Sequence, residues 1–387
     1  MNNKKIFEWM KNYVDQKKFN GCCLLISQNN KVLLNAGYGH LDKNKTKPFE
    51  TDSIVRIFSM TKAIVSTCLL ALLAKEKIPI DTKISYFLSQ FEQCYALEGR
   101  AATINDVKKV PTPTIAQLLN HTSGLSYFFN EDLLAHEYLK RDITTAPNNS
   151  NLEDTINKLA EVPLAFEPGL FWNYSVGIDV AGRIIEIISG KALDVFLEEF
   201  LFEPLEMTDT SFYLPSQKRE RFADCFFFEG MTPNFLPLEN LYKNFSFEKS
   251  EVSNFSGGSG LLSTAHDYSK FADLLINDGT LRGRKFLSEN VIKNIRTNSL
   301  PKDIASIGVK SFAQMSTKGM GHSLAGSIII NPSVEFPSNT NDFGWGGMGS
   351  NYFWVDFTRR LSAIFITQLI PSSAYSNRKE LKALSFH

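Results

Sequence analysis

Ser59-Met60-Thr61-Lys62 opens a long apolar run, Ala63 to Ala74 (AIVSTCLLALLA). The run is apolar on nearly all sides, which is typical of a helix buried in a protein core. It is well short of the roughly 20 apolar residues that are needed to span a bilayer. We therefore predict a core helix and no transmembrane segment.

Ser59 and Lys62 are three positions apart, so at the head of a helix their side chains share one face, with Cβ atoms about 5 to 6 Å apart. The helix N-terminus directs free N–H groups toward any negative charge that develops nearby. A lysine that loses its hydration through burial favours the neutral form, which can act as a general base. Equally, the serine could cap the helix while the lysine extends to solvent. The two residues alone leave both interpretations open.

Strand patterns lie near both ends of the chain. Gly21–Ser27 and Lys31–Tyr38 flank Gln28-Asn29-Asn30, which suits a hairpin of two antiparallel strands. Apolar runs predict three later strands, namely Ser327–Ile330, Tyr352–Asp356 and Leu361–Ile370, the last of which is stopped by Pro371. The predicted sheet therefore takes strands from both termini.

The middle of the chain is rich in helical patterns, such as Val176–Ser189 before Gly190 and Ala265–Asp278 before Gly279. The fold class that we predict is α/β plus all-α. We expect a single two-lobed catalytic domain over residues 1–387. Its α/β lobe would cover about 1–85 and 255–387, and a mostly helical lobe would be inserted at about 86–254.

The 387 residues include 41 basic and 41 acidic side chains, which cancel to a formal charge of zero. Nothing in this balance favours phosphate or an anionic membrane, so we expect no nucleic-acid partner. The N-terminal sequence breaks into charges and predicts an amphipathic helix in place of a signal peptide, so we expect a cytoplasmic protein. Neither the five cysteines nor the six histidines have metal-ligand spacing, and we predict no metal or cofactor. The composition leaves the oligomeric state open.

Four segments resemble, in order, the motifs of one enzyme family. They are Ile54–Lys62, Leu118–Leu125 (LLNHTSGL), Tyr174-Ser175-Val176 and Gly257–Thr264 (GGSGLLST). Over roughly residues 20–370 they resemble penicillin-recognising serine hydrolases, specifically the branch of class C β-lactamases and family VIII carboxylesterases. The resemblance implies a β-lactamase/transpeptidase-like fold with a central antiparallel sheet. It also implies an acyl-enzyme on Ser59, with Lys62 as the general base.

Tyr174 stands in a loop just before a predicted helix. By its setting alone it would be expected to pack beside Trp172. The resemblance instead implies that Tyr174 shares a proton with Ser59 and Lys62 and relays it to the leaving group. For His121, which lies within LLNHTSGL, we expect a structural role in the loop.

Departures from the class C pattern narrow the range of substrates that the resemblance implies. No Lys-Thr-Gly occurs, and the corresponding place holds Trp345-Gly346-Gly347-Met348, which resembles the family VIII version. An indole in place of the lysine offers an apolar face and one N–H donor, so a substrate carboxylate would lose its charged anchor. Val176 replaces the asparagine that, in class C enzymes, contacts the acyl-side amide of the lactam. Both changes favour neutral esters.

We expect the substrate-binding residues to be Trp345, Gly346, Gly347 and Val176. The glycines, which lack a Cβ, would let the strand approach the substrate. The backbone N–H groups of Ser59 and Met348 would form the oxyanion hole.

These patterns predict a serine hydrolase, foremost a carboxylesterase for small or medium neutral esters, or an acyltransferase that uses the same acyl-enzyme. A β-lactamase or D-alanyl-D-alanine peptidase and a catalytically silent scaffold are the alternatives. Phenylalanines gather between residues 225 and 255, in what reads as a long loop: Phe226, Phe227, Phe228, Phe235, Phe245, Phe247 and Phe255. They would either wall an acyl pocket or, as we favour, pack the helical lobe.

Overall fold

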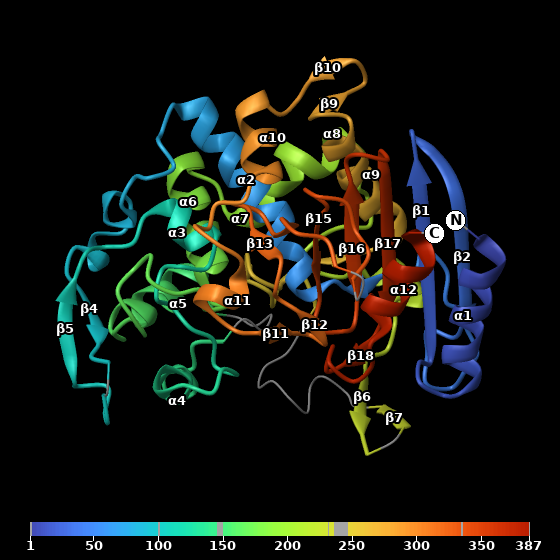
Figure 1. Cartoon of the computed structure of the whole chain (residues 1–387), viewed down its shortest axis with the longest axis horizontal. Helices are drawn as coiled ribbons and strands as arrows, with labels where there is room; N and C mark the ends of the chain where they lie inside the picture. Colours follow the sequence, from blue (N-terminus) through green and yellow to red (C-terminus); the bar gives the residue numbers. More distant parts are fainter. Residues whose placement is uncertain are drawn as a thin grey trace.

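The computed structural model describes residues 2–99, 101–144, 150–230, 232–235, 247–333 and 336–386. Its largest element is an antiparallel sheet of seven strands in the order β13-β14-β15-β16-β17-β1-β2 (Figure 1). The strands are β1 (Gly21–Gln28), β2 (Lys31–Gly39), β13 (Met320–His322), β14 (Ser327–Ile329), β15 (Phe343–Gly346), β16 (Tyr352–Asp356) and β17 (Leu361–Thr367). The prediction of an antiparallel sheet built from both ends of the chain is therefore confirmed.

The β1–β2 hairpin turns at Asn29 and Asn30, whose φ angles are 51° and 61°. Two successive residues in the left-handed region form the turn whose twist matches that of paired strands, and asparagine tolerates this region better than most residues. β1 lies inside the sheet and is buried, whereas β2 lies at the edge and is exposed or half-buried. A local turn signal thus joins the first two strands as predicted.

Two helices, α1 (Asn3–Asp15) and α9 (Ala265–Ile276), contact the sheet. α12 (Asn377–Phe386) contacts α1, and its Lys382 Nζ lies 5.0 Å from the centroid of the Trp354 ring in β16. On the α1 face, Trp9 packs on Phe365 of β17 with ring centroids 5.5 Å apart. On the α9 face, Asp273 accepts a 3.3 Å hydrogen bond from Ser362 of β17. Neighbouring strand residues point to opposite faces, so the odd and even positions of β17 meet different layers. The sheet is buried between these layers.

The apolar run Leu361–Ile370 is not one strand, as predicted, but two. β17 ends at Thr367, and β18 (Leu369–Ile370) pairs in parallel with β6 (Phe226–Glu229), which also pairs with β7 (Thr232–Phe235). Between β17 and β18, the side-chain amide of Gln368 accepts from the backbone N–H of Arg56 and donates to its carbonyl. This long-range contact breaks the strand. The long-loop interpretation of residues 225–235 is also wrong, because they contain β6 and β7.

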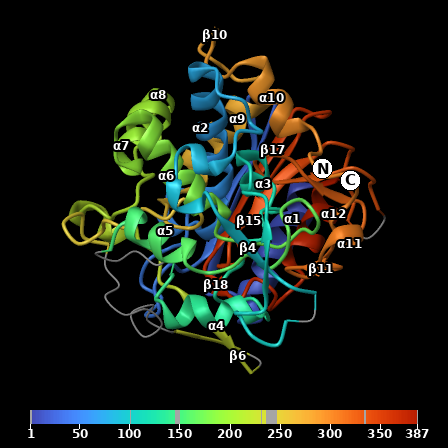
Figure 2. The same ribbon diagram turned by 90° about the vertical axis from the view of Figure 1, so that its left-hand side faces the viewer.

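Helices of the middle of the chain are α3 (Ile115–Leu119), α4 (Leu133–Lys140), α5 (Leu152–Ala160), α6 (Gly177–Ser189), α7 (Leu193–Leu197) and α8 (Glu203–Leu205). α3 to α6 lie together to one side of the sheet, on the left in Figure 1 and toward the viewer in Figure 2. α6 ends where predicted, before Gly190, whose φ of 68° closes the helix in the left-handed conformation. The sequence pattern does not predict the hairpin of β4 (Cys94–Leu97) and β5 (Val107–Val110) in this part. The division into two lobes stays a prediction.

Short elements complete the description. The helices are α10 (Glu289–Arg296) and α11 (Ile304–Ile307), and the paired strands are β3 (Val55–Arg56) with β8 (Leu262–Ser263), β9 (Thr280–Leu281) with β10 (Arg284–Lys285), and β11 (Ser311–Phe312) with β12 (Met315–Ser316). The β3–β8 pair matters most for the site, because the chain passes from β3 directly toward Ser59.

α2 (Thr61–Glu76) is the helix predicted from the apolar run. A 3₁₀ turn, η1 (Phe58–Met60), precedes it, so the helical stretch Phe58–Glu76 has 19 residues and is longer than predicted. By length and composition this stretch could cross a bilayer, but 78% of its most apolar window is buried inside the protein. α2 contacts α6 and α10, which also shows that it is a core helix.

Asp273 generates a prediction about stability and pH. Burial raises the pKa of Asp273 to about 6, above its usual value of 3.8. Between pH 3.8 and pH 6 the Asp273 carboxyl is ionised in the unfolded chain but still protonated in the folded one. Ionisation therefore favours the unfolded chain, and the free energy of unfolding falls as the pH rises through this range. The loss is complete above pH 6. Asp273→Asn should therefore raise that free energy at pH 7.5 by roughly 1 kcal/mol, after allowance for partial exposure, and change it little at pH 3.5.

Urea unfolding of both proteins at the two pH values measures this effect. Asp81→Asn, at an exposed aspartate, is the control and should show no such difference between the two pH values. A gain for Asp273→Asn that is equal at pH 3.5 and 7.5 would contradict the explanation.

Candidate active site

Ser59 lies in the middle of η1, between β3 and α2. The preceding residue, Phe58, has a φ of 47°, in the left-handed region that a bulky side chain rarely adopts. Such strain costs about 1 to 3 kcal/mol and is concentrated at functional sites. The strained backbone at Phe58 places both residues in the wall of one cavity.

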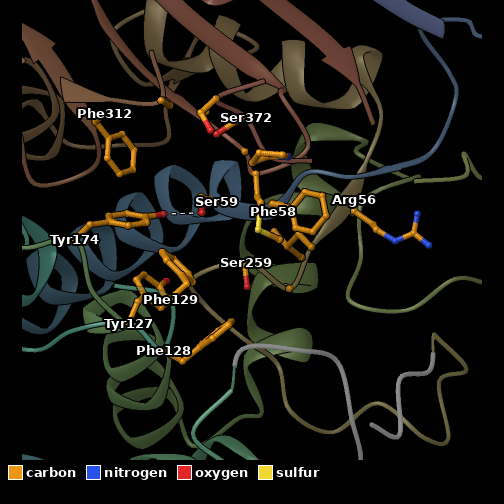
Figure 3. Close-up of a pocket in the computed structure, with 18 of the residues that line it drawn as sticks. Arg56, Phe58, Ser59, Tyr127, Phe128, Phe129, Tyr174, Ser259, Phe312 and Ser372 are labelled. Carbon is orange, nitrogen blue, oxygen red and sulfur yellow. Dashed lines mark hydrogen bonds between the residues drawn. The ribbon is translucent and has the colours of Figure 1, made fainter. Parts of the chain in front are cut away.

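Ser59 and Tyr174, which the sequence singles out, both line this cavity, and their hydroxyl groups point toward each other (Figure 3). Tyr174 Oη donates a 2.6 Å hydrogen bond to Ser59 Oγ, and Lys62 Nζ lies 3.5 Å from the same oxygen. Lys62 Nζ also lies 4.7 Å from the centroid of the Tyr174 ring. Lys62 is 3% exposed and Tyr174 is 7% exposed. A serine, an amine and a phenol are thus within proton-transfer reach of one another, largely screened from water.

Lys62 has two further partners, which the sequence analysis does not identify. Its Nζ donates 2.7 Å hydrogen bonds to Tyr127 Oη and to the carbonyl oxygen of Gly258. Together with Ser59 Oγ, these acceptors fill the three donor positions of an ammonium group. The amine is therefore held in one place beside Ser59.

Tyr127 follows the LLNHTSGL segment by two positions and begins the aromatic run Tyr127-Phe128-Phe129. That run in a loop is the signal that could have pointed to it. Burial raises the pKa of Tyr127, and the nearby Tyr174 and Asp179 raise it further, so the phenol stays protonated at neutral pH. The structure therefore adds Tyr127 to the site as a neutral partner of Lys62.

Asp179, in the first turn of α6, holds Gly258 in place. Its Oδ1 accepts hydrogen bonds from the Gly258 N–H, at 3.1 Å, and from Ser256 Oγ, at 2.5 Å. Burial raises the pKa of Asp179, while attraction to Lys62 and these hydrogen bonds oppose the rise. A Cβ at Gly258 would lie less than 3.0 Å from Asp179 Oδ2, so the close approach requires glycine. Asp179 thus fixes one of the acceptors that position Lys62.

His121 has the structural role that we expect. It is buried, its Nδ1 lies 3.2 Å from Ser175 Oγ, and its ring packs edge-on against Tyr174 with centroids 4.9 Å apart. Burial, foremost, holds the pKa of His121 well below its usual value, with His322 and Lys62 adding to the effect, so the imidazole is neutral at pH 7. It supports the Tyr174 ring and does not touch Ser59.

The chain continues from the end of β15 into the cavity wall, which is lined by Gly346, Gly347 and Met348. The two glycines are required by protein contacts, whereas we expected them to make room for substrate. A Cβ at Gly347 would lie less than 3.0 Å from the Ile57 carbonyl oxygen, and one at Gly346 less than 3.0 Å from the Arg378 guanidinium. The close approach of Gly347 to Ile57 brings Met348 beside the segment that carries Ser59.

Trp345 and Val176 do not line the cavity, in contrast to our expectation that they bind substrate. Trp345 is 5% exposed and packs against two residues that do line it, Phe312 and Tyr174, with ring centroids 5.8 and 5.7 Å away. Val176 is buried at the start of α6. The Trp345 ring therefore lies behind these two lining side chains, while Gly346 and Gly347 are part of the wall.

The cavity has a volume of about 360 Å³, and a third of its lining residues are aromatic. Its aromatic residues are Phe58, Tyr127, Phe128, Phe129, Tyr174, Phe247 and Phe312. Of the phenylalanines between 225 and 255, Phe247 lines the cavity, Phe227 packs near Phe58, and Phe226 and Phe255 pack in the core. Phe245 lies outside the described residues. Phe247 thus contributes to the cavity wall, and Phe226, Phe227 and Phe255 pack against neighbouring side chains.

A sequence model of the Beta-lactamase family matches residues 6–385. The chain belongs to the β-lactamase family. Among its relatives is esterase EstB of Burkholderia gladioli, 26% identical over 367 residues, which cover 91% of this chain and 86% of EstB. Another is acyltransferase calJ of Penicillium decumbens, 26% identical over 337 residues, which cover 84% of this chain and 78% of calJ.

The fold is similar to that of EstCE1, whose solved structure is described as a hydrolase with promiscuous acyltransferase activity. The TM-score is 0.81 at 21% identity, and the match covers 99% of this chain and 97% of EstCE1. This similarity confirms the β-lactamase/transpeptidase-like fold. Membership of the β-lactamase family, together with relatives named as esterases, makes the chain a serine hydrolase, as predicted.

Tyr127 provides a test of how Lys62 is positioned. Tyr127→Phe removes the oxygen to which Lys62 donates, and a buried donor left without its partner costs about 1 to 3 kcal/mol. We expect kcat/KM for p-nitrophenyl butyrate to fall about 10-fold or more. Tyr138→Phe is the matched control, because Tyr138 is equally buried but its hydroxyl accepts from the Ser126 N–H. An unchanged rate in Tyr127→Phe would show that the phenol does not hold the amine.

Proposed function

We propose that this chain is a carboxylesterase that hydrolyses small or medium neutral esters through an acyl-enzyme on Ser59. The observation that carries the proposal is the approach of both Tyr174 Oη, at 2.6 Å, and Lys62 Nζ, at 3.5 Å, to Ser59 Oγ in the wall of one cavity. A serine hydroxyl needs an adjacent base to act as a nucleophile. The relative EstB, which is named an esterase, supports the reaction class.

In acylation, Ser59 Oγ attacks the ester carbonyl carbon while Lys62, as a neutral amine, takes the hydroxyl proton. As the ester C–O bond breaks, Tyr174 gives its proton to the alkoxide oxygen of the leaving group, which departs as the alcohol. The Lys62 ammonium then returns a proton to the Tyr174 phenolate. The products of this half-reaction are the free alcohol and acyl-Ser59, with the amine neutral again.

In deacylation, water enters in place of the alcohol. The Tyr174–Lys62 pair takes a proton from the water as its oxygen attacks the acyl carbon, and Ser59 Oγ recovers a proton when its bond to that carbon breaks. Ester and water have then become acid and alcohol. An alcohol that enters instead of water would receive the acyl group by the same step, and the descriptions of calJ and EstCE1 favour acyl transfer as the second candidate.

We assign the oxyanion hole to the backbone N–H groups of Ser59 and Met348. Both residues line the cavity, and Gly347 lies against Ile57, two positions before Ser59. Donors fixed in advance where negative charge develops stabilise the transition state more than the ester, because they need no reorganisation.

The cavity wall favours a neutral substrate. Aromatic side chains form a third of its lining, no lysine is among the lining residues, and its two arginines, Arg56 and Arg378, donate to backbone carbonyls. Trp345 stands where class C enzymes carry a lysine, and its ring packs behind Phe312, so β15 presents no ammonium to a substrate carboxylate. These features weigh against a β-lactamase or peptidase as the main activity, and the assembled Ser59 site weighs against a silent scaffold.

The ratio of kcat/KM for p-nitrophenyl butyrate to that for nitrocefin tests the proposal. Without the lysine, a lactam carboxylate loses a charge-assisted hydrogen bond of about 1.5 to 3 kcal/mol, or roughly 10- to 150-fold in productive binding. We expect a ratio far above one, and Ser59→Ala should abolish both activities while the melting temperature stays the same. A ratio below one would make the chain a β-lactamase by function, and turnover by Ser59→Ala would exclude Ser59 as the nucleophile.

A further inference from the structure

Arg378, at the start of α12, is a buried cation in the wall of the cavity. Its side chain is 4% exposed, and no carboxylate of the described residues lies within ion-pair distance of it. Burial lowers the pKa of Arg378 to about 10, so the guanidinium is still charged at neutral pH. A buried positive charge without an acidic partner is costly. The other contacts of Arg378 must therefore stabilise it.

Within the described part of the chain, the hydrogen bonds of the guanidinium go to backbone carbonyls, and its Cζ lies 5.7 Å from the centroid of the Tyr352 ring. Its Nη2 donates to the carbonyl oxygen of Gly347, at 2.7 Å, and to that of Asn351, at 3.1 Å. The Gly347 N–H donates to the same Asn351 carbonyl, at 3.0 Å. Both polar backbone groups of Gly347 are therefore fixed, and Gly346 leaves the room that the guanidinium needs.

The carbonyl of Gly347 belongs to the same peptide unit as the N–H of Met348. Resonance couples the two ends of a peptide unit, so a cation bound at the oxygen makes the N–H a stronger donor. In a trans peptide the two groups point in opposite directions. Because the carbonyl faces Arg378, the Met348 N–H faces away from it, on the side of the cavity that holds Ser59.

We propose that Arg378 is a positioning residue of the oxyanion hole, which orients and polarises the Gly347–Met348 peptide so that the Met348 N–H binds the developing oxyanion more strongly. The inference rests on the proposed function. The charge acts where negative charge appears only during the reaction, so its effect falls on the transition state and on kcat more than on substrate binding.

α12 is also held by contacts that do not involve Arg378. One turn further along the helix, Lys382 forms a buried 2.7 Å ion pair with Asp342, next to the start of β15. Asn377 Nδ2 donates to the Ser350 carbonyl, at 3.2 Å, in the loop after Met348. The C-terminal helix is thus tied to the sheet and to the oxyanion loop by separate contacts.

Kinetics of Arg378→Met and Arg378→Lys with p-nitrophenyl butyrate test the proposal. Loss of a whole oxyanion donor costs about 100- to 1,000-fold in kcat, so weakening one should lower kcat about 10- to 100-fold in Arg378→Met, with KM within about threefold. Arg378→Lys keeps a charged donor and should recover part of the loss. The double variant Asp342→Asn with Lys382→Met removes the ion pair of α12 without touching Gly347, and it should keep kcat near that of the unchanged enzyme.

Two outcomes would overturn the inference. If the double variant loses as much kcat as Arg378→Met, the arginine only docks the helix. If Arg378→Met keeps kcat for the neutral butyrate and instead raises KM for the anionic p-nitrophenyl hemisuccinate, the guanidinium binds a substrate carboxylate directly.

A second readout does not require activity. With the eight methionines labelled with ¹⁵N, the Met348 amide proton should resonate further downfield in the unchanged protein than in Arg378→Lys or Arg378→Met. An identical shift in all three proteins would refute the polarisation. If the unchanged protein turns over no ester, the proposed function fails, whereas an active enzyme with unaltered kcat in Arg378→Met refutes only the role of Arg378.

Discussion

The structure depends on holding one buried amine, Lys62, at a fixed place beside Ser59. Burying such a group is costly unless its hydrogen-bonding capacity is met. Besides the nearby Ser59 Oγ, two partners from distant segments meet it here, Tyr127 Oη and the Gly258 carbonyl. Asp179 in turn fixes Gly258. Each partner explains why a separate loop must meet the head of α2, and together they make a core helix the centre of the chemistry.

The part of the site formed by Gly347 and Met348 depends on a close approach between two backbone segments. Gly347 must lie against Ile57, which brings a C-terminal loop to an N-terminal segment across more than half of the sequence. The seven-stranded sheet makes this meeting possible, because β1 and β17 pair and carry both ends of the chain into one layer. Arg378 and the Lys382–Asp342 ion pair then fasten α12 behind the loop.

Local signals in the sequence predict much of the fold. The apolar run of α2, the Asn29-Asn30 turn and the left-handed Gly190 are each encoded within a few residues, and the structure has all three. Long-range contacts are not encoded in this way. Gln368 ends β17 because it bonds to Arg56, and the pattern of residues 361–370 carries no trace of that. Likewise the motifs indicate Ser59, Lys62 and Tyr174. The role of Arg378 emerges only from its neighbours in space, and Trp345 packs behind Tyr174 and Phe312 without lining the cavity.

The central claim is that Ser59 is the nucleophile, and covalent labelling tests it most directly. The native protein is treated with a fluorophosphonate, digested and analysed by mass spectrometry, alongside Ser59→Ala and a sample unfolded before treatment. The account predicts one phosphonyl adduct, on the peptide that contains Ser59, which is absent from Ser59→Ala and from the unfolded sample because activation needs the assembled Lys62 and Tyr174. An adduct on another residue, or no adduct on the folded protein, would contradict it.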